Sequence, residues 1–365
     1  MKHIKLLFLL IQFSLLSFSQ TAWQSGFDAE EYTNFLSLAF YKHNNADSNR
    51  NTTTQSSFPL LYRSPEVGML NRWYLYQYGN DAAVISIRGT VQQTPSWIAN
   101  FYAAMIPASG QLQLNDSTTF NYQLASNPKA MVHAGWTISL AHLAPDIVEK
   151  ISNLYNEKKI RRFYIFGHSQ GGAIAFLLRS HLAYLQQKGE IPADIAFKTY
   201  CSAAPKPGNL FYAYDFDFIT RGGWAFNIVN AADWVPETPI SIQSYDDFNE
   251  TNPVVFAKSV LKKQPLPLRL VGNKIVNSMG RASKKAQKKL KRYLGKLAFT
   301  QVIKTLPQMK EPAYANGNNY MRAGTPIVLL PDETYHNVYP AKTENLFLHH
   351  MYEPYLMLIK KYYPK

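Results

Sequence analysis

The chain has 365 residues, 46% of them hydrophobic, and a formal net charge of +14. This composition supplies apolar material for a sizeable core and excludes a wholly disordered chain. Cys201 is the only cysteine, so an internal disulfide is excluded as well. Because Cys201 lies in an apolar run, we interpret it as a small buried residue and not as a reactive thiol.

The first 19 residues have the features of a secretory signal peptide. Lys2 and Lys5 precede an apolar stretch over residues 6–18, and Ser17 and Ser19 are small residues of the kind found before a cleavage site. The stretch is short for a transmembrane helix, although an uncleaved anchor is the alternative. We therefore expect an exported protein, secreted or periplasmic, with one domain over residues 20–365.

Strands and helices are predicted to alternate along much of the chain. After a helix over 28–41 and a polar loop over 43–57, two β-prone runs at 73–78 and 82–87 flank a turn and indicate a hairpin. Further strands are predicted at 120–124, 130–133, 163–166, 195–202, 225–229 and 326–330, and helices at 136–155, 171–186 and 354–362. The strand–helix alternation predicts an α/β fold with a mostly parallel central sheet flanked by helices.

A candidate catalytic serine lies in the segment Gly167-His168-Ser169-Gln170-Gly171, which fits the pattern G-x-S-x-G. In a nucleophile elbow this pattern joins a strand to a helix, and the serine adopts a strained backbone conformation. The pattern by itself is weak, because ordinary glycine-rich turns also contain it. Here a strand is expected before the segment and a helix after it, which favours Ser169 as a nucleophile.

A serine nucleophile needs a base and an acid that orients the base. In enzymes with this elbow the acid and then the histidine follow the serine along the chain. Asp233 comes shortly after the strand predicted at 225–229, where the sites of open α/β sheets lie. The candidate histidines are His336, His349 and His350. The remaining acids considered, Asp215, Asp217, Asp246 and Asp247, are interpreted as solvated loop residues.

Several segments together resemble the class 3 lipases. Ile87-Arg88-Gly89-Thr90 resembles the oxyanion strand of that family, and Ser96-Trp97-Ile98-Ala99-Asn100 is similar to its lid. Further similar segments are Val132-His133-Ala134-Gly135-Trp136, Ala204-Pro205-Lys206-Pro207-Gly208-Asn209, Val229-Asn230 and Asp233-Trp234-Val235-Pro236. The resemblance implies an α/β-hydrolase fold, with Ser169 as nucleophile, Asp233 as the orienting acid, and the backbone N–H groups of Thr90 and Gln170 as the oxyanion hole. The position of Gln170 at a helix start agrees with that role.

The resemblance also bears on the choice of histidine. The family usually has a tyrosine five positions after its catalytic histidine, and His350 and Tyr355 have this spacing. His350 is therefore the predicted base, with His349 as the alternative because its local sequence is also similar to the family. His336 is interpreted as a surface or packing residue, and His133 and His168 as structural residues near the elbow.

Two interpretations of the segment 97–106 stay open. Its apolar side chains line an acyl-chain groove or form a movable lid, or the segment is a helix packed on the sheet. The local family resemblance favours the lid, with Trp97, Ile98 and Phe101 as substrate-contacting residues.

The stretch between Asp233 and His350 is longer than compact members of the family need, and it contains a basic insertion over 258–310. This insertion holds fifteen lysines and arginines and no acidic residue, so the rest of the chain is nearly neutral. Residues 279–297 form an amphipathic pattern with apolar positions on one side of a helix. We predict peripheral association of this helix with an anionic membrane surface, and the alternative is a helix that packs its leucines on the body and leaves its lysines in water.

Taken together, the sequence predicts a secreted serine ester hydrolase, a lipase that cleaves acylglycerols or related carboxylic esters through an acyl-enzyme. A phospholipase or an esterase for polar esters is the enzymatic alternative, and a protein that binds anionic surfaces on a hydrolase fold is the non-enzymatic one. No metal or organic cofactor and no nucleic-acid partner is expected.

Overall fold

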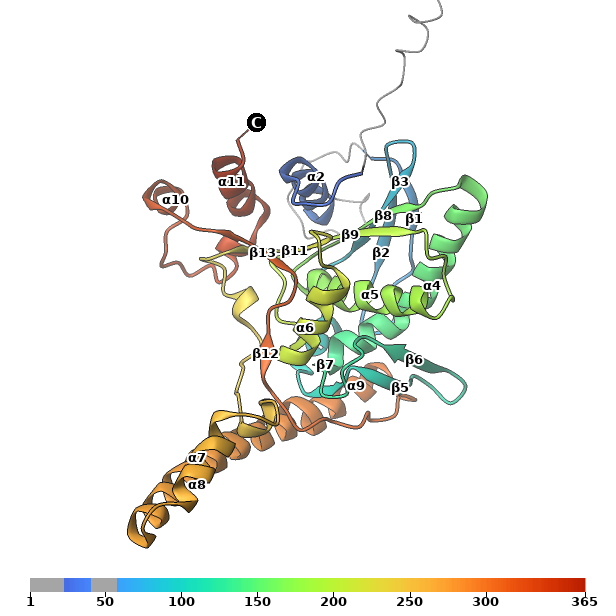
Figure 1. Ribbon diagram of the computed structural model, residues 1–365. Helices are drawn as coiled ribbons and strands as arrows, with labels where there is room; N and C mark the ends of the chain where they lie inside the picture. Colours follow the sequence, from blue (N-terminus) through green and yellow to red (C-terminus); the bar gives the residue numbers. More distant parts are fainter. Residues whose placement is uncertain (1–22, 41–57, 365) are drawn as a thin grey trace, which may run out of the picture.

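The computed structural model describes residues 23–40 and 58–364 (Figure 1). The predicted signal segment over 1–19 and the predicted loop over 43–57 lie outside the described residues, and the division into a signal segment and one domain over 20–365 stays a prediction. In the described part of the chain, no helix combines the length and the apolar character needed to cross a bilayer.

Seven strands form the central sheet, in the order β1-β2-β3-β8-β9-β11-β13. The first three strands pair antiparallel, and every pairing from β3 to β13 is parallel. The seven strands are Leu60–Arg63, Trp73–Tyr78, Ala82–Ile87, Arg162–His168, Ala196–Ser202, Ala225–Asn230 and Thr325–Leu329. This mostly parallel sheet with helices on both faces confirms the predicted α/β-hydrolase fold.

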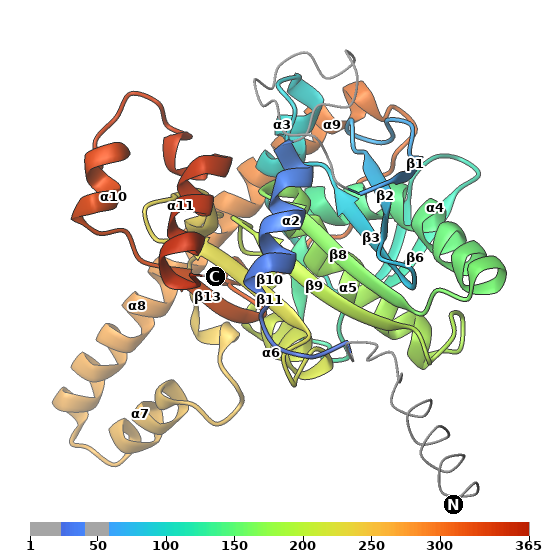
Figure 2. The same cartoon turned by 90° about the horizontal axis from the view of Figure 1, so that it is seen from above.

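The helices form one layer on each face of the sheet (Figures 1 and 2). One layer contains α4 (Ala134–Lys158) and α5 (Gln170–Gln187), and the other contains α2 (Ala29–Phe40) and α11 (Tyr352–Tyr362). Strand β8 shows how the sequence specifies two buried faces: Phe163 and Ile165 join the core under α4 and α5, whereas Tyr164 and Phe166 join the core under α2 and α11. Successive residues of a strand point to opposite faces, so an unbroken apolar run is buried on both.

Two smaller sheets lie beside this core. One has the order β12-β10-β7-β4 and the other pairs β5 with β6. Their strands are β4 (Met105–Pro107), β5 (Ser109–Gln113), β6 (Thr119–Gln123), β7 (Met131–His133), β10 (Gly208–Asn209) and β12 (Tyr320–Met321). The remaining short helices of the body are α3 (Thr94–Phe101), α6 (Leu210–Ile219), η1 (Val235–Glu237), η2 (Tyr245–Asp247), α10 (Glu333–Val338) and η4 (Leu348–His350). The sequence did not predict β1, β4, β5 or α6, because these elements are short or lack a clear apolar period.

The basic insertion is helical and divides into two parts. Helices α7 (Pro253–Lys262) and α8 (Leu266–Lys291) form a hairpin that projects from the body (Figure 1). A π-helical turn, η3 (Arg292–Leu297), then leads into α9 (Ala298–Thr305), whose Val302 is fully buried. Helix α8 contacts the body through Gly280, which lies against the ring of Tyr245, and through Gln287, which donates to the carbonyl of Ile242 at 2.9 Å.

Candidate active site

Ser169 lies in the turn between β8 and α5, with φ 61° and ψ −130°. A positive φ is strained for a residue other than glycine and costs about 1–3 kcal/mol, which the surrounding structure must offset. Part of that support comes from a hydrogen bond of 2.9 Å from the Ser169 N–H to the carbonyl of Ser202. Two glycines make the turn possible: a Cβ atom on Gly167 would lie 2.2 Å from the Gly171 backbone, and one on Gly171 would lie 2.2 Å from the Ile87 carbonyl.

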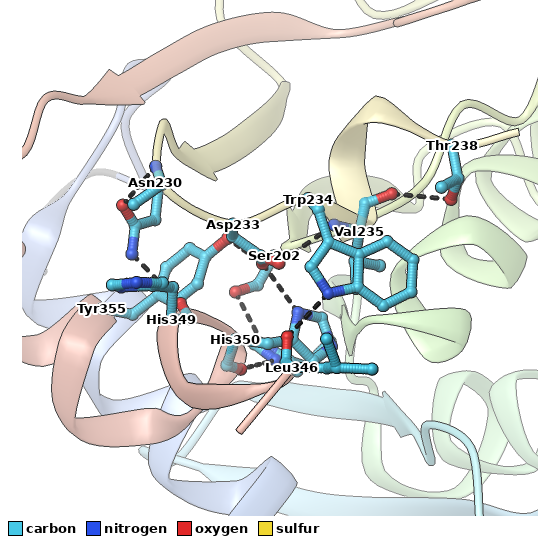
Figure 3. A network of polar contacts seen from close by, with 12 residues as sticks. Ser202, Asn230, Asp233, Trp234, Val235, Thr238, Leu346, His349, His350 and Tyr355 are labelled. Atoms are coloured by element: carbon cyan, nitrogen blue, oxygen red, sulfur yellow. Dashed lines mark hydrogen bonds and ion pairs between the residues drawn. The ribbon is translucent and has the colours of Figure 1, made fainter. Parts of the chain in front are cut away.

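His350 and Asp233 meet at the end of the sheet, although 117 residues separate them (Figure 3). His350 Nδ1 is 2.7 Å from Asp233 Oδ2, and the Tyr355 hydroxyl donates to the same oxygen at 2.9 Å. The other oxygen, Asp233 Oδ1, accepts from the backbone N–H of Val235 at 3.0 Å. Asp233 is 2% exposed, so three donors within hydrogen-bonding distance hold a desolvated carboxylate beside the imidazole.

His349 points to a different partner. Its Nδ1 lies 2.7 Å from the Tyr335 hydroxyl. Asn230 donates to the His349 carbonyl at 3.0 Å (Figure 3). Burial lowers the pKa of His349, which favours the neutral ring. The structure therefore brings His350 and not His349 to Asp233, and the catalytic role of either histidine stays a prediction.

His168, which the sequence placed among structural residues, connects the elbow to the loop that carries His350. Its Nε2 lies 2.9 Å from the His350 carbonyl and its Nδ1 lies 3.0 Å from Ser202 Oγ. Ser202 Oγ is in turn 2.8 Å from the hydroxyl of Tyr32 in α2. The His350 carbonyl can only accept, so His168 donates from Nε2. This buried chain links the N-terminal helix to the histidine loop, and no sequence pattern indicated it.

Thr90 lies in the loop after β3, directly beside the elbow. The loop approaches so closely that a Cβ on Gly89 would be 3.0 Å from the His168 carbonyl and 3.7 Å from Ser169 Cβ. Gln170 begins α5, where the first N–H groups of a helix lack partners within the helix. Both predicted oxyanion donors therefore belong to backbone segments that adjoin Ser169.

Asn100, for which no sequence motif predicted a role of its own, joins these two segments. Its Nδ2 donates to Thr90 Oγ1 at 3.0 Å, and its Oδ1 accepts from Gln170 Nε2 at 2.8 Å. The same Oδ1 accepts from Trp136 Nε1 at 3.0 Å, and the Asn100 carbonyl accepts from His133 Nε2 at 3.1 Å. Burial lowers the pKa of His133 to about 3, so its ring stays neutral. An asparagine within an apolar helical segment was the one available signal for this network.

The segment 97–106 is not one continuous helix, contrary to one of its two interpretations. Helix α3 ends at Phe101, and residues Met105–Pro107 form β4 because they pair with β7. Within α3, Trp97 and Ile98 are half-buried and Phe101 is exposed, while the Trp97 ring lies 6.0 Å from the ring of Phe347 in the histidine loop. Helix α3 therefore lies between the oxyanion segments and the loop of His350, and whether it moves as a lid stays a prediction.

Two acids interpreted as solvated loop residues are buried instead. Asp215 accepts from the Tyr184 hydroxyl at 2.6 Å and from Ser126 Oγ at 2.7 Å. Asp247 caps its own turn and accepts from Gln287 Nε2 at 3.0 Å. Both carboxylates stabilise contacts between segments that are distant in the sequence, which a local pattern does not reveal.

The remaining candidates lie apart from this arrangement. His336, in α10, is 3.3 Å from the carbonyl of Tyr339 through Nδ1. Cys201 is buried, as predicted, and burial raises the pKa of its thiol. Over residues 23–40 and 58–364, no group of three or more histidine, cysteine, aspartate or glutamate side chains is arranged to hold a metal ion.

Residues 84–242 match the model of the family named lipase (class 3). Over these residues the chain is similar to the class 3 lipases. The match contains Thr90, Asn100, Ser169 and Asp233, and it ends before His350 and before the basic insertion.

Two curated relatives are fungal proteins of this kind. The secreted mono- and diacylglycerol lipase MDL4 of Malassezia globosa is 31% identical over 121 residues, covering 32% of this chain and 36% of that protein. Secreted mono- and diacylglycerol lipase 3 of Gibberella zeae is 30% identical over 110 residues, covering 30% of this chain and 33% of that protein. The chain thus spans about a third of the length of these relatives.

Solved structures of fungal lipases also resemble the chain. The lipase–propeptide complex of Rhizomucor miehei shows 18% identity and a TM-score of 0.40, covering 59% of this chain and 65% of that one. A mutant form of MDLA from Penicillium cyclopium shows 19% identity and a TM-score of 0.41, covering 58% of this chain and 73% of that one.

Proposed function

We propose that this protein is a class 3 lipase that hydrolyses carboxylic esters of the acylglycerol type, with Ser169 as nucleophile, His350 as base and Asp233 as orienting acid. The observation that carries the proposal is the strained serine between β8 and α5 combined with the hydrogen-bonded pair of His350 and Asp233 at the same end of the sheet. The two curated relatives are named mono- and diacylglycerol lipases, which supports this substrate class.

In the proposed reaction, Ser169 Oγ attacks the ester carbonyl while His350 Nε2 takes the serine proton. The negative charge on the carbonyl oxygen is stabilised by the N–H groups of Thr90 and Gln170. His350 then returns the proton to the departing alcohol and leaves an acyl group on Ser169. Water attacks this acyl-enzyme with His350 as base, which releases the acid and restores the serine.

Asp233 has two tasks in this scheme. Its Oδ2 accepts from His350 Nδ1, which fixes the imidazole with Nε2 free to act as base, and its charge stabilises the imidazolium that forms. The Tyr355 hydroxyl and the Val235 N–H hold the carboxylate in place during both steps. No hydrogen bond joins Ser169 Oγ to His350 in the described part of the chain, and such contacts often tighten only when substrate binds.

We also propose that α3 acts as a lid, with Trp97, Ile98 and Phe101 contacting the acyl chain. The exposed ring of Phe101 and the half-buried Trp97 and Ile98 beside the oxyanion segments support this role.

The relatives' names describe secreted enzymes, which supports export of this chain as well. Finally, we propose peripheral association with anionic membrane surfaces through the basic helix over 279–297.

A fluorophosphonate probe tests the nucleophile directly. We expect covalent labelling of Ser169, no labelling of Ser169→Ala, and loss of ester hydrolysis by several orders of magnitude in that variant. Ser139→Ala is the matched control, because Ser139 is buried in α4 and donates to the Gly135 carbonyl of its own helix. Labelling of Ser169→Ala at the wild-type level would refute the assignment.

Comparing monoacylglycerol, diacylglycerol, phospholipid and short polar esters would then separate the lipase from the phospholipase and polar-esterase alternatives.

A further inference from the structure

The α7–α8 hairpin is the least covered structured part of the described chain. None of the ten residues of α7 is buried, and of the 26 residues of α8 only Gly280 and Gln287 are buried. Both of these lie in the half of α8 that contacts the body, so the tip of the hairpin projects beyond it (Figures 1 and 2). Helix α8 thus contacts the body on one side, packs against α7 on another and exposes the rest of its surface to solvent.

The exposed surface of this hairpin is unusually apolar. On α8, Leu268, Val271, Ile275 and Met279 are each more than half exposed, and they recur at intervals of three or four residues. On an ideal helix they fall within an arc of about 80° and so form one continuous stripe. Helix α7 adds Phe256, which is 70% exposed. The apolar stripe therefore extends from the predicted helix over 279–297 to the tip of the hairpin.

Basic residues border the stripe on the side that faces away from the body. Lys274, Arg281, Lys285 and Lys289 are exposed and lie on one flank of the stripe on an ideal helix, whereas Gly280 and Gln287 lie on the other flank. Where the helix rejoins the body, Arg292, Tyr293, Lys296, Leu297 and Thr300 line a shallow hollow of about 290 Å³. Cationic and apolar groups thus lie side by side from Leu268 to Thr300.

We propose that the α7–α8 hairpin is a membrane anchor, whose apolar stripe enters the interface of an anionic bilayer while the basic flank contacts lipid phosphates. A bilayer surface offers both acyl chains and negative charge, which this combination of side chains requires. A second copy of the chain is a poorer fit, because residues 258–310 carry fifteen positive charges and no negative one and would repel each other.

The anchor connects to the candidate active site through continuous structure. Helix α8 continues through η3 into α9, and α9 packs against α3. The Ala104 N–H donates to the Leu294 carbonyl at 3.0 Å, and the ring of Tyr102 lies 6.1 Å from that of Phe299. An anchored hairpin would therefore hold the α3 side of the enzyme near the membrane. This consequence rests on the proposed lipase function, whereas anchoring deepens the membrane association proposed above and does not depend on ester hydrolysis.

Vesicle binding by Ser169→Ala tests the anchor without lipid hydrolysis, so its outcome is independent of the proposed reaction. We expect binding to vesicles of phosphatidylcholine with roughly 30 mol% phosphatidylglycerol, at least about tenfold weaker binding to phosphatidylcholine alone, and weakening by salt. Equal binding to both vesicles, or binding to neither, would overturn the proposal.

Two sets of substitutions in the Ser169→Ala background separate the contribution of the apolar stripe to vesicle binding from that of the basic residues. Ile275→Asp with Met279→Asp should weaken anionic-vesicle binding at least about tenfold, because two apolar side chains are replaced by negative ones. The matched control is Phe218→Asp, which changes an exposed apolar residue of α6, outside the hairpin. The basic set replaces Lys274, Arg281, Lys285 and Lys289 by Gln, and its control replaces Lys158, Lys188, Lys342 and Lys360 by Gln.

Full binding by the Ile275→Asp/Met279→Asp variant would refute insertion of the stripe. A dimeric protein that becomes monomeric with the same substitutions, in the absence of vesicles, would show that a second copy covers the stripe instead. An environment-sensitive label at Ile275→Cys reports insertion directly, because Cys201 is buried and leaves the new thiol as the accessible one. Its emission should shift to the blue with anionic vesicles, and a label at Phe218→Cys should not shift.

Discussion

Helices α5 and α8 are both long, but α5 is almost wholly buried whereas α8 has almost no buried residue. In α5 every residue from Gln170 to Leu185 is buried, whereas in α8 only two of 26 residues are. Helix α5 lies between the central sheet and neighbouring helices, and its N-terminus follows Ser169. Helix α8 contacts the body only near its C-terminal half. A helix enclosed on all sides fixes a reactive group within a fraction of an ångström, and a helix with free apolar and basic sides is suited to a surface partner.

The proposed ester hydrolysis depends on the exact placement of side chains around α5. The proposed membrane association depends instead on which side chains the α7–α8 hairpin exposes. Substitutions near α5 should change turnover or stability strongly. Substitutions on the outer part of the hairpin should change neither, although they should change binding to anionic vesicles.

The largest effect is expected at the histidine pair. His350→Ala should lower kcat/KM for a soluble ester by about four orders of magnitude, because the members of a triad act as a unit. His349→Ala should lower it by less than about tenfold, since His349 is hydrogen-bonded to Tyr335 and not to Asp233. Steady-state kinetics with p-nitrophenyl butyrate measures both. The reverse ranking would assign the base to His349.

A smaller effect is expected at the oxyanion segment. Thr90→Gly and Asn100→Ala should each lower kcat by about 10- to 100-fold with little change in KM. Both remove the side-chain hydrogen bond that positions the Thr90 N–H, and oxyanion contacts strengthen in the transition state. Asn100 acts as a positioning residue through its hydrogen bond to Thr90 Oγ1. The double variant should lose less than the product of the two single effects. A rise in KM with unchanged kcat would contradict this role.

The two parts of the insertion should differ in stability. Val302→Ala removes two methyl groups from a fully buried site in α9 and should lower the free energy of unfolding by about 2 kcal/mol. Leu270→Ala, on the exposed part of α8, should lower it by less than about 0.5 kcal/mol. Urea denaturation followed by circular dichroism provides the comparison. Equal costs would mean that the hairpin is packed against a surface in solution.

The smallest effect on turnover is expected from excision of the hairpin tip. Replacing residues 253–279 by a Gly-Ser linker should leave hydrolysis of a soluble ester within about twofold of wild type, because no residue of that range is buried. A tenfold fall in turnover would show that the hairpin supports the active site. Binding of the same protein to anionic vesicles should weaken at least about tenfold, because the excision removes Leu268, Val271, Ile275 and Met279 of the stripe.

Local sequence determined the elbow, the strand–helix alternation and the segregation of charge. The apolar run at 163–166, the two glycines and the following helical period are all contained within about twenty residues, and backbone geometry follows directly from them. The helix predicted at 28–41 and the hairpin strands predicted at 73–78 and 82–87 appear at nearly the same positions for the same reason. The basic insertion was visible from charge alone.

Tertiary structure decided what depends on the direction of a side chain or on a distant partner. His349 and His350 are neighbours in sequence, and only the path of the loop after α10 turns one toward Tyr335 and the other toward Asp233. Asp215 and Asp247 are buried because hydroxyl and amide donors from other segments meet them. For α8, the sequence period predicted which side of the helix is apolar. In the structure the body does not cover that side, because it contacts α8 through Gly280 and Gln287 on a different side. Burial depends on which surfaces meet, and a helical period records only which residues share a face.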